Sequence, residues 1–421
     1  MRGLLFLLLA AAGCASPPPA RTLASLPPAK PAAELETTTP EAQGMSRAPL
    51  VQLTRWIGDT PIPLFSLLVS RHGKLVYELY TSSFDRDDAH YLMSVTKSVV
   101  SALVGVAIDR HLLPGPDATV GELLPRDLFP SDGDAARFRG VTLRQVMGMQ
   151  GLDAPDPPRD ESPEALARYH RFWTSPSRLR FVLGGPLLGQ GFQYNDATPT
   201  LATGVLQYAT GKTVLEFAEE TLFGPMGFRN EEWLHQDASG LDNGGYGLRL
   251  RPVDMQKLGL LYLHHGVWNG RQLLSADWVT RSFEPWNRSR PDAAQPDYGW
   301  FWWAYDFGPG WSAHVANGWK GQRIAVFPDQ DIVLTMTACI EDGSEHALFE
   351  ELVKKVLMPS VADGATAGPP KDPGELDALL HEVHGGAPRL GDWIEYRMVP
   401  SAAPKMKRRP FDRVGAARSA H

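Results

Sequence analysis

The chain has 421 residues, enough for one large domain or two domains of medium size. Hydrophobic residues make up 43% of it, as in a protein with a buried core, and the formal net charge of −7 argues against a nucleic-acid-binding surface. The only two cysteines, Cys14 and Cys339, provide no framework for a disulfide-rich scaffold or a cysteine-based zinc site.

The first fourteen residues are typical of a bacterial export signal. Arg2 precedes an apolar run over residues 4–12, which is too short to span a bilayer. The run ends in Ala-Ala-Gly-Cys, which resembles a lipobox, so we expect lipid attachment at Cys14. The alternative is a plain secretory signal with an incidental cysteine. A lipid anchor predicts a protein of the bacterial cell envelope that faces the periplasm, and Ala15 is compatible with sorting to the outer membrane.

The segments on either side of the central region differ from it in composition. Residues 15–45 are rich in Pro, Ala and Thr, which predicts an extended tether. Residues 46–358 form the expected folded domain, and residues 359–421 a partly disordered C-terminal extension with a basic tail. His381 and His384 could suggest a metal site, but without a third ligand a solvated helix face is the better interpretation.

The folded domain begins with an expected β-hairpin over residues 64–80. Two apolar runs flank His72-Gly73, and the second run alternates from one residue to the next. A helix is expected to follow from Ser94, with residues 99–108 apolar on nearly all sides.

The middle of the domain is expected to be rich in helices, because helix start and stop signals recur along it. Capping boxes pair Thr142 with Gln145 and Thr213 with Glu216. Between these helices, Thr198 is the expected N-cap of a helix that has Pro199 at its first position and ends at Gly211. A further helix is expected over residues 251–266.

After residue 296 the pattern changes to short β-rich runs separated by Gly, Pro and Asp, and residues 345–357 predict a closing helix. The run that contains Cys339 is apolar, so this residue is expected to pack as a small hydrophobic side chain. Strands from both ends of the domain are expected to pair into one antiparallel sheet flanked by helices, with the helix-rich region inserted between them. This predicts a mixed α/β (α+β) fold.

Ser94 and Lys97 are a candidate pair of catalytic residues. Residues three apart lie on the same face of a helix, so the hydroxyl and the amine are expected side by side. Burial in such an apolar helix favours a neutral Lys97 with a lowered pKa, able to act as a general base for a serine nucleophile. The backbone N–H groups at the helix start could bind an oxyanion. A Ser N-cap followed by a solvent-reaching lysine is the alternative.

Two downstream motifs complete the candidate site. Tyr194-Asn195-Asp196 lies on the loop before a predicted helix, where a side chain can point into a cleft. Trp319-Lys320-Gly321 precedes a β-rich run, so we expect a strand edge there beside the serine. In a strand, successive side chains point to opposite faces, so if Trp319 faces Ser94, Gly321 is expected to face it too and Lys320 to point away.

Together these motifs resemble the serine β-lactamase and penicillin-binding-protein superfamily, and especially its class C-like branch of esterases and 6-aminohexanoate-oligomer hydrolases. The resemblance covers residues 42–358 and rests on SLLVSRHGKLVYELY, MSVTKSVVSALVGVAID, VTLRQVMGMQGL, YNDATPTLATGVLQYATGK, GLRLRPVDMQKLGLLYLHHGVWNGRQLL and GWKGQRIAVFPDQDIVL. It implies a β-lactamase/transpeptidase-like fold and a reaction that needs no metal or cofactor.

The resemblance also implies a role for each motif residue. Ser94 would be the acylated nucleophile, Lys97 its base, and Tyr194 a second base that protonates the leaving group. The backbone N–H groups of Ser94 and Gln322 would form the oxyanion hole. Asn195, Asp196, Trp319, Lys320 and Gly321 would contact substrate. The sequence departs from the family pattern at Asp196, where Asn or Ser is usual, and at Trp319, where Lys or His is frequent.

The predicted function is therefore that of a serine hydrolase that cleaves a small amide or ester through an acyl-enzyme. A β-lactamase or D,D-peptidase of the same fold is one alternative. A catalytically silent envelope lipoprotein that binds cell-wall fragments is another. The expected partners are a small-molecule substrate and, through Cys14, a membrane.

Overall fold

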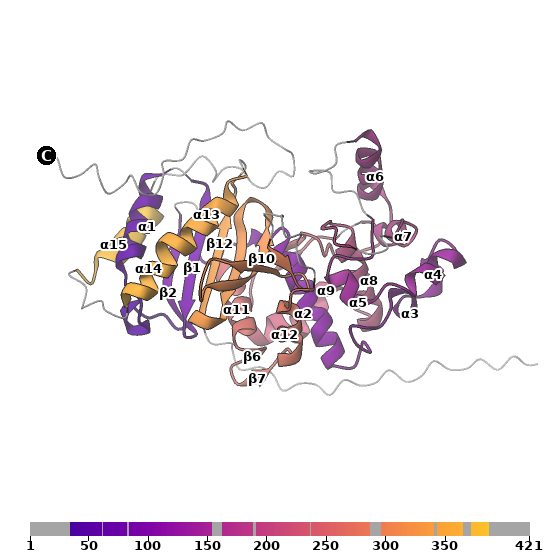
Figure 1. Ribbon diagram of the computed structural model, residues 1–421, viewed down its shortest axis with the longest axis horizontal. Helices are drawn as coiled ribbons and strands as arrows, with labels where there is room; N and C mark the ends of the chain where they lie inside the picture. The colour runs from indigo at the N-terminus through magenta and orange to yellow at the C-terminus, as the bar shows by residue number, and fades with distance from the viewer. Residues whose placement is uncertain are drawn as a thin grey trace, which may run out of the picture. The chain divides into compact units, whose positions relative to one another are not determined.

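Strands from both ends of the folded domain form one seven-stranded antiparallel sheet in the computed structural model (Figure 1), as the sequence predicts. The structure describes residues 34–60, 62–81, 84–153, 162–187, 191–235, 237–286, 296–340, 343–364 and 372–386. The strand order is β2 (Lys74–Tyr80), β1 (Leu64–Arg71), β12 (Ile332–Ala338), β11 (Gln322–Phe327), β10 (Ser312–Gly318), β9 (Trp303–Asp306) and β8 (Asp297–Tyr298).

The centre of the sheet joins chain segments more than 250 residues apart. Leu67 of β1 lies opposite Met336 of β12, and the hydroxyls of Ser66 and Thr337 are 2.7 Å apart in the interior. Every residue of β12 is buried, including Thr335 and Thr337, so both faces of this strand are covered. The predicted hairpin is confirmed, since β1 pairs with β2 across His72 and Gly73, both with positive φ. Cys339 is buried, as predicted.

Helices cover both faces of this sheet (Figure 1). Helices α1 (Ala48–Asp59), α13 (Glu345–Leu352), α14 (Met358–Gly364) and α15 (Glu375–His384) lie together on one face. Helix α11 (Pro252–Leu263) packs directly on β1, β11 and β12. This close approach requires Gly259, because a Cβ there would lie 2.4 Å from Val333 Cγ1. Helix α2 (Val95–Asp109) packs on β10 and β11 of the sheet and on helices of the inserted region.

A helix-rich region is inserted between β2 and β8, again as predicted. Its longer helices are α6 (Pro163–Thr174), α8 (Thr198–Thr210) and α12 (Ala276–Phe283). Its shorter helices are α3 (Val120–Leu123), α4 (Asp132–Phe138), α5 (Leu143–Met147), α7 (Arg178–Leu183), α9 (Val214–Ala218) and α10 (Gly224–Met226). Its minor strands are β3 (His90–Tyr91), β4 (Glu232–Trp233), β5 (Leu248–Leu250), β6 (Val267–Trp268) and β7 (Arg271–Gln272). Both predicted capping boxes are present.

The packed part of the chain extends beyond the predicted boundaries at residues 46 and 358. Leu35 and Met45 are buried, and Thr37 bridges to Leu75, so residues 34–45 lie against the domain rather than in a tether. At the other end, Leu376 and Val383 of α15 are buried where this helix meets α1. Local composition predicts these edges poorly, because only the tertiary contacts decide whether a Pro-rich segment packs. Cys14 and residues 15–33 lie outside the described residues. Among the residues that the structure describes, no helix is long and apolar enough to span a membrane.

Candidate active site

Ser94 occupies the position just before the first residue of α2. Its side chain makes no capping hydrogen bond, and Lys97, one turn later, is only 1% exposed. Met93, which precedes the serine, has a φ of 49°, a left-handed conformation that is uncommon for methionine. The backbone N–H of Ser94 donates to no backbone carbonyl of the described residues. These features argue against a simple N-cap with a solvent-reaching lysine and leave both the hydroxyl and an N–H group for other partners.

The Lys97 ammonium is held by three oxygen atoms. Its Nζ lies 2.8 Å from Ser94 Oγ, 2.8 Å from Asp196 Oδ1 and 2.7 Å from the Gly245 carbonyl oxygen. An ammonium has three N–H donors and no acceptor, so this set of contacts suits a charged lysine. Since all three partners can accept, Lys97 is a donor to Ser94 in this arrangement.

The charge of Lys97 corrects the prediction of a neutral amine. Burial by itself lowers the pKa of Lys97 and is the largest single effect. The attraction of the Asp196 carboxylate and the Tyr194 phenol together outweighs burial, so the pKa lies above the usual value for lysine. The expectation of a lowered pKa is therefore wrong, because sequence reasoning included desolvation but not the carboxylate that the fold brings to the amine.

Asn195 and Asp196 are adjacent in sequence, but Asn195 supports the start of helix α8, whereas Asp196 pairs with Lys97. Asn195 is buried, and its Oδ1 accepts hydrogen bonds from the backbone N–H groups of Ala197 and Thr198 at 3.0 and 2.7 Å. It thus caps α8, whereas Thr198, the predicted cap, is already the first helical residue. The neighbouring Asp196 turns its carboxylate to Lys97 and keeps 37% of its side chain exposed.

Tyr194 lies against the same ammonium. Its ring centroid is 5.0 Å from Lys97 Nζ, and the ring packs on Trp303 at 5.4 Å and edge-on to Tyr298 at 6.0 Å. These aromatic contacts come from β8 and β9, so the sheet edge fixes the orientation of the phenol.

A glycine-rich turn after residue 242 supplies a site component that sequence reasoning missed. Asn243 Oδ1 accepts hydrogen bonds from the backbone N–H groups of Gly245 and Tyr246 at 2.9 and 3.1 Å. This turn aims the Gly245 carbonyl at Lys97. The Asn-Gly-Gly sequence is a turn signal, but nothing in it identifies a carbonyl that binds an ammonium 148 positions away.

The third motif forms a turn rather than a strand edge, which corrects the prediction. Residues 319–321 make a 3-10 turn between β10 and β11, with Lys320 at φ 64° and Gly321 at φ 106°. Trp319 is 54% exposed, whereas Lys320 is buried with its Nζ 4.6 Å from the Trp319 ring centroid. The alternation expected of a strand therefore does not apply, because two successive residues have left-handed backbone conformations.

This turn lies next to the segment that leads into Ser94. A Cβ at Gly318 would lie 2.4 Å from the carbonyl oxygen of Leu92, two residues before the serine. Gln322, the first residue of β11, is buried and donates its side-chain amide to the Ala338 carbonyl at 2.5 Å and to the Trp319 carbonyl at 3.3 Å. The fold thus brings all three predicted motifs into one region.

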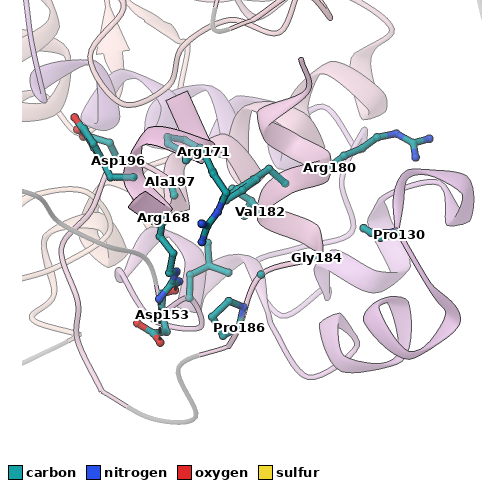
Figure 2. Close-up of a pocket in the computed structure, with 15 residues that line it drawn as sticks. Pro130, Asp153, Arg168, Arg171, Arg180, Val182, Gly184, Pro186, Asp196 and Ala197 are labelled. Carbon is teal, nitrogen blue, oxygen red and sulfur yellow. Dashed lines mark hydrogen bonds and ion pairs between the residues drawn. The ribbon is translucent and has the colours of Figure 1, made fainter. Parts of the chain in front are cut away.

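A cavity of about 410 Å³ has Asp196 among its lining residues (Figure 2). Its walls are mainly apolar and come from α6, α7 and the loop that enters α8. Ala197 and Asp196 lie at one end and Arg180 at the other, while Arg168 points to Asp153. Asp196 both lines this cavity and binds Lys97, so an apolar group bound here would lie beside the carboxylate partner of Lys97.

Comparisons with known proteins agree with this architecture. The Beta-lactamase family model matches residues 53–351. The 6-aminohexanoate-dimer hydrolase of Paenarthrobacter ureafaciens is 26% identical over 226 residues, which are 51% of this chain and only 55% of that relative. A candidate 6-aminohexanoate-dimer hydrolase of Bacillus anthracis has a similar structure, with a TM-score of 0.60 and 18% identity over 77% of this chain and 87% of that one. EstCE1, a hydrolase with promiscuous acyltransferase activity, matches with a TM-score of 0.55 and 17% identity over 76% of this chain and 100% of that one.

The family model covers most of the folded domain, including the segments of all three motifs. The structural matches support the fold, namely an antiparallel sheet flanked by helices. The chain therefore belongs to the beta-lactamase family of hydrolases.

Proposed function

We propose that this protein is a serine hydrolase that cleaves a small amide or ester through an acyl-enzyme on Ser94. The observation that carries the proposal is the 2.8 Å contact between Lys97 Nζ and Ser94 Oγ, at a helix start where the serine hydroxyl is not used for capping. A hydroxyl next to a fixed cation is more easily deprotonated, because the cation stabilises the developing alkoxide.

In acylation, Ser94 Oγ forms a bond to the substrate carbonyl carbon, and the bond from that carbon to the leaving nitrogen or oxygen breaks. Lys97 is cationic and donates to Ser94, so it cannot take up the serine proton. We assign that step to Tyr194, which accepts the proton of Ser94 as it passes its own proton to the leaving group. Water then attacks the acyl carbon and the bond from that carbon to Ser94 Oγ breaks. Tyr194 accepts a proton from the water as it returns its own proton to Ser94, which restores the free enzyme.

The charge that develops on the carbonyl oxygen needs fixed donors. We assign this role to the backbone N–H groups of Ser94 and Gln322. The first has no backbone acceptor among the described residues, and the second directly follows the turn of residues 319–321, beside which Gly318 packs on Leu92. Such donors are worth about 10²- to 10³-fold in rate.

Two features favour a substrate without a carboxylate next to the reacting bond. Trp319 presents an exposed indole where the family often has a cation, and Lys320 is buried against that indole. The cavity beside Asp196 has room for an apolar part of the substrate. We therefore propose uncharged esters or amides, which agrees with the amide and ester hydrolases among the similar proteins.

We also propose that the chain is anchored in the bacterial envelope through a lipid on Cys14. The support is the signal-like composition of residues 1–14. Replacing Cys14 by Ala should release the protein from the membrane fraction or block its processing. An unmodified mature N-terminus located elsewhere, observed by mass spectrometry, would rule out this anchor.

A fluorophosphonate probe tests the hydrolase directly. We expect covalent labelling of the purified protein at Ser94, identified by peptide mass spectrometry, and no labelling of a folded Ser94→Ala variant. A panel of nitrophenyl esters, short amides and a chromogenic cephalosporin then identifies the substrate class. Wild-type protein that is folded but neither labelled nor active on any of these compounds would contradict the proposal and favour a binding role.

A further inference from the structure

Another buried cation besides Lys97, Arg323, lies behind the turn that carries the third motif. It is the second residue of β11, and its side chain has no exposed surface. No carboxylate of the described residues lies within ion-pair distance of its guanidinium. Burial lowers the pKa of Arg323, against the attraction of Tyr305, Glu345 and Tyr194. A buried guanidinium without an ion-pair partner is costly, which raises the question of what it does.

The guanidinium ties together the two ends of the turn. Arg323 Nη1 donates to the carbonyl oxygens of Gly318 at 2.6 Å and Gln322 at 2.8 Å, the two residues that flank Trp319–Gly321. A single planar group thus fixes the spacing of both sides of a turn whose backbone is in left-handed conformations.

The other side of the guanidinium contacts a histidine. Arg323 Nη2 lies 2.9 Å from His346 Nδ1 on α13. Arginine only donates, so His346 Nδ1 is the acceptor and carries no proton. Burial lowers the pKa of His346, as does the repulsion of Arg323, while Glu345 acts in the opposite direction. Neutral His346 is therefore the state that completes the contact.

We propose that Arg323 and His346 form a positioning pair that holds the turn of residues 319–321, and with it the Gln322 N–H, in the geometry required beside Ser94. The inference rests on the proposed function, since it assigns the support of the oxyanion hole. When His346 takes up a proton, it can no longer accept from Arg323, and two cations face each other. The turn then loosens, and turnover falls on the acid side.

The groups that surround this pair define its electrostatics. Glu345 adjoins His346 on α13, Tyr305 faces the guanidinium from β9, and Tyr194 attracts it from the reacting side. Tyr305 also accepts a hydrogen bond from Asn317 Nδ2 at 3.3 Å, next to Gly318. Of these groups, His346 is the one whose proton uptake removes an acceptor from Arg323.

The test compares two replacements of His346 in the full-length protein. His346→Asn retains an acceptor close to the Nδ1 position and does not titrate, whereas His346→Leu has no acceptor. We expect His346→Leu to lower kcat about 10- to 100-fold with little change in KM. The wild type should lose kcat at acid pH, with a midpoint below the ordinary histidine pKa because the pKa of His346 is lowered. Compared with His346→Leu, His346→Asn should restore kcat, and it should flatten the acid limb of the wild type. Arg323→Lys should resemble His346→Leu, while Arg71→Lys, a remote strand arginine that binds the Gly44 carbonyl, is the control.

Fluorophosphonate labelling of the wild type separates the two proposals. If the wild type is labelled at Ser94 and His346→Leu and Arg323→Lys retain wild-type kcat, the positioning role alone is overturned. If the wild type is folded but neither labelled nor active, the hydrolase proposal falls and this inference with it. Should the leucine and lysine variants not fold, the acid limbs of the wild type and His346→Asn decide: identical limbs overturn the positioning pair.

Discussion

Lys97 and Arg323 are both cationic side chains with almost no exposure, yet their surroundings differ. Lys97 has a carboxylate partner 2.8 Å away, and its pKa is raised. Arg323 is bound to carbonyl oxygens and a histidine, and its pKa is lowered. Lys97 contacts the candidate nucleophile, whereas Arg323 contacts the backbone carbonyls of Gly318 and Gln322 on either side of the turn. Burial alone therefore does not indicate the charge state of a side chain; the partners that the fold supplies decide it.

The largest effect is expected at the cation that touches the nucleophile. Ser94→Ala and Lys97→Ala should each reduce kcat/KM by about 10⁴-fold or more, because one removes the covalent bond and the other the charge that activates it. The double variant should be little worse than either single variant. Steady-state kinetics with a nitrophenyl ester measures this, and circular dichroism checks the fold. Substantial turnover by folded Ser94→Ala protein, freed of contaminating enzyme, would refute the assignment.

Removal of the carboxylate should make the surroundings of Lys97 resemble those of Arg323. In Asp196→Asn the attraction is lost and burial dominates, so the pKa of Lys97 should fall below its wild-type value. Because the proposed mechanism needs a cationic Lys97, the alkaline limb of the kcat/KM profile should move to lower pH. At pH 7 the loss should be about 10- to 100-fold.

Asp153→Asn is the matched control for this variant, since Asp153 lines the same cavity but pairs with Arg168 rather than with Lys97. Its alkaline limb should match that of the wild type. An unchanged limb in Asp196→Asn would show that Lys97 does not depend on the carboxylate for its charge.

Substrate preference sharpens the comparison further, because neither cation is available to a substrate carboxylate. The donors of Lys97 are all used, and Arg323 is enclosed. A missing charge-assisted contact is worth about 1.5–3 kcal/mol, or roughly ten- to more than a hundred-fold in kcat/KM. We expect a nitrophenyl ester to exceed a chromogenic cephalosporin by at least this factor under identical conditions. Efficient cephalosporin turnover with little esterase activity would instead favour a β-lactamase.

The smallest effect concerns stability and tests the rule that burial without an ion-pair partner favours the neutral form. Burial lowers the pKa of His90 to about 3 and that of His314 to about 4, so both are neutral in the folded protein. The unfolded chain binds these protons near pH 6.5. The stability from each is therefore complete above pH 6.5, and about 1.4 kcal/mol is lost for each pH unit below it, down to the folded pKa.

Urea denaturation between pH 7 and pH 4.5 measures this slope. His90 stacks on Phe65 with ring centroids 5.5 Å apart and lies tilted to Phe84 at 5.0 Å, so His90→Phe keeps the aromatic packing and removes one titrating group. The variant should lose stability less steeply with falling pH. Equal slopes for the two proteins would show that His90 does not contribute.

Local sequence signals were sufficient to predict those features that depend on a single helix or hairpin. The S-x-x-K spacing, the apolar run after it, both capping boxes and the hairpin at His72-Gly73 each depend on contacts within a few residues, so periodicity and turn chemistry determined them. The pairing of strands from both ends of the domain also followed, because apolar strands on either side of a helix-rich segment need a common core.

Only the tertiary structure decided the charge of Lys97, the shape of the third motif and the support behind it. The Asp196 carboxylate and the Gly245 carbonyl reach Lys97 from 99 and 148 positions away, and nothing in the spacing of residues encodes that meeting. The turn at residues 319–321 likewise depends on close packing against Leu92 and on Arg323, whose guanidinium contacts His346 of α13. Electrostatics inside a protein depends on distances of a few ångströms between groups remote in sequence, and those distances exist only once the chain has folded.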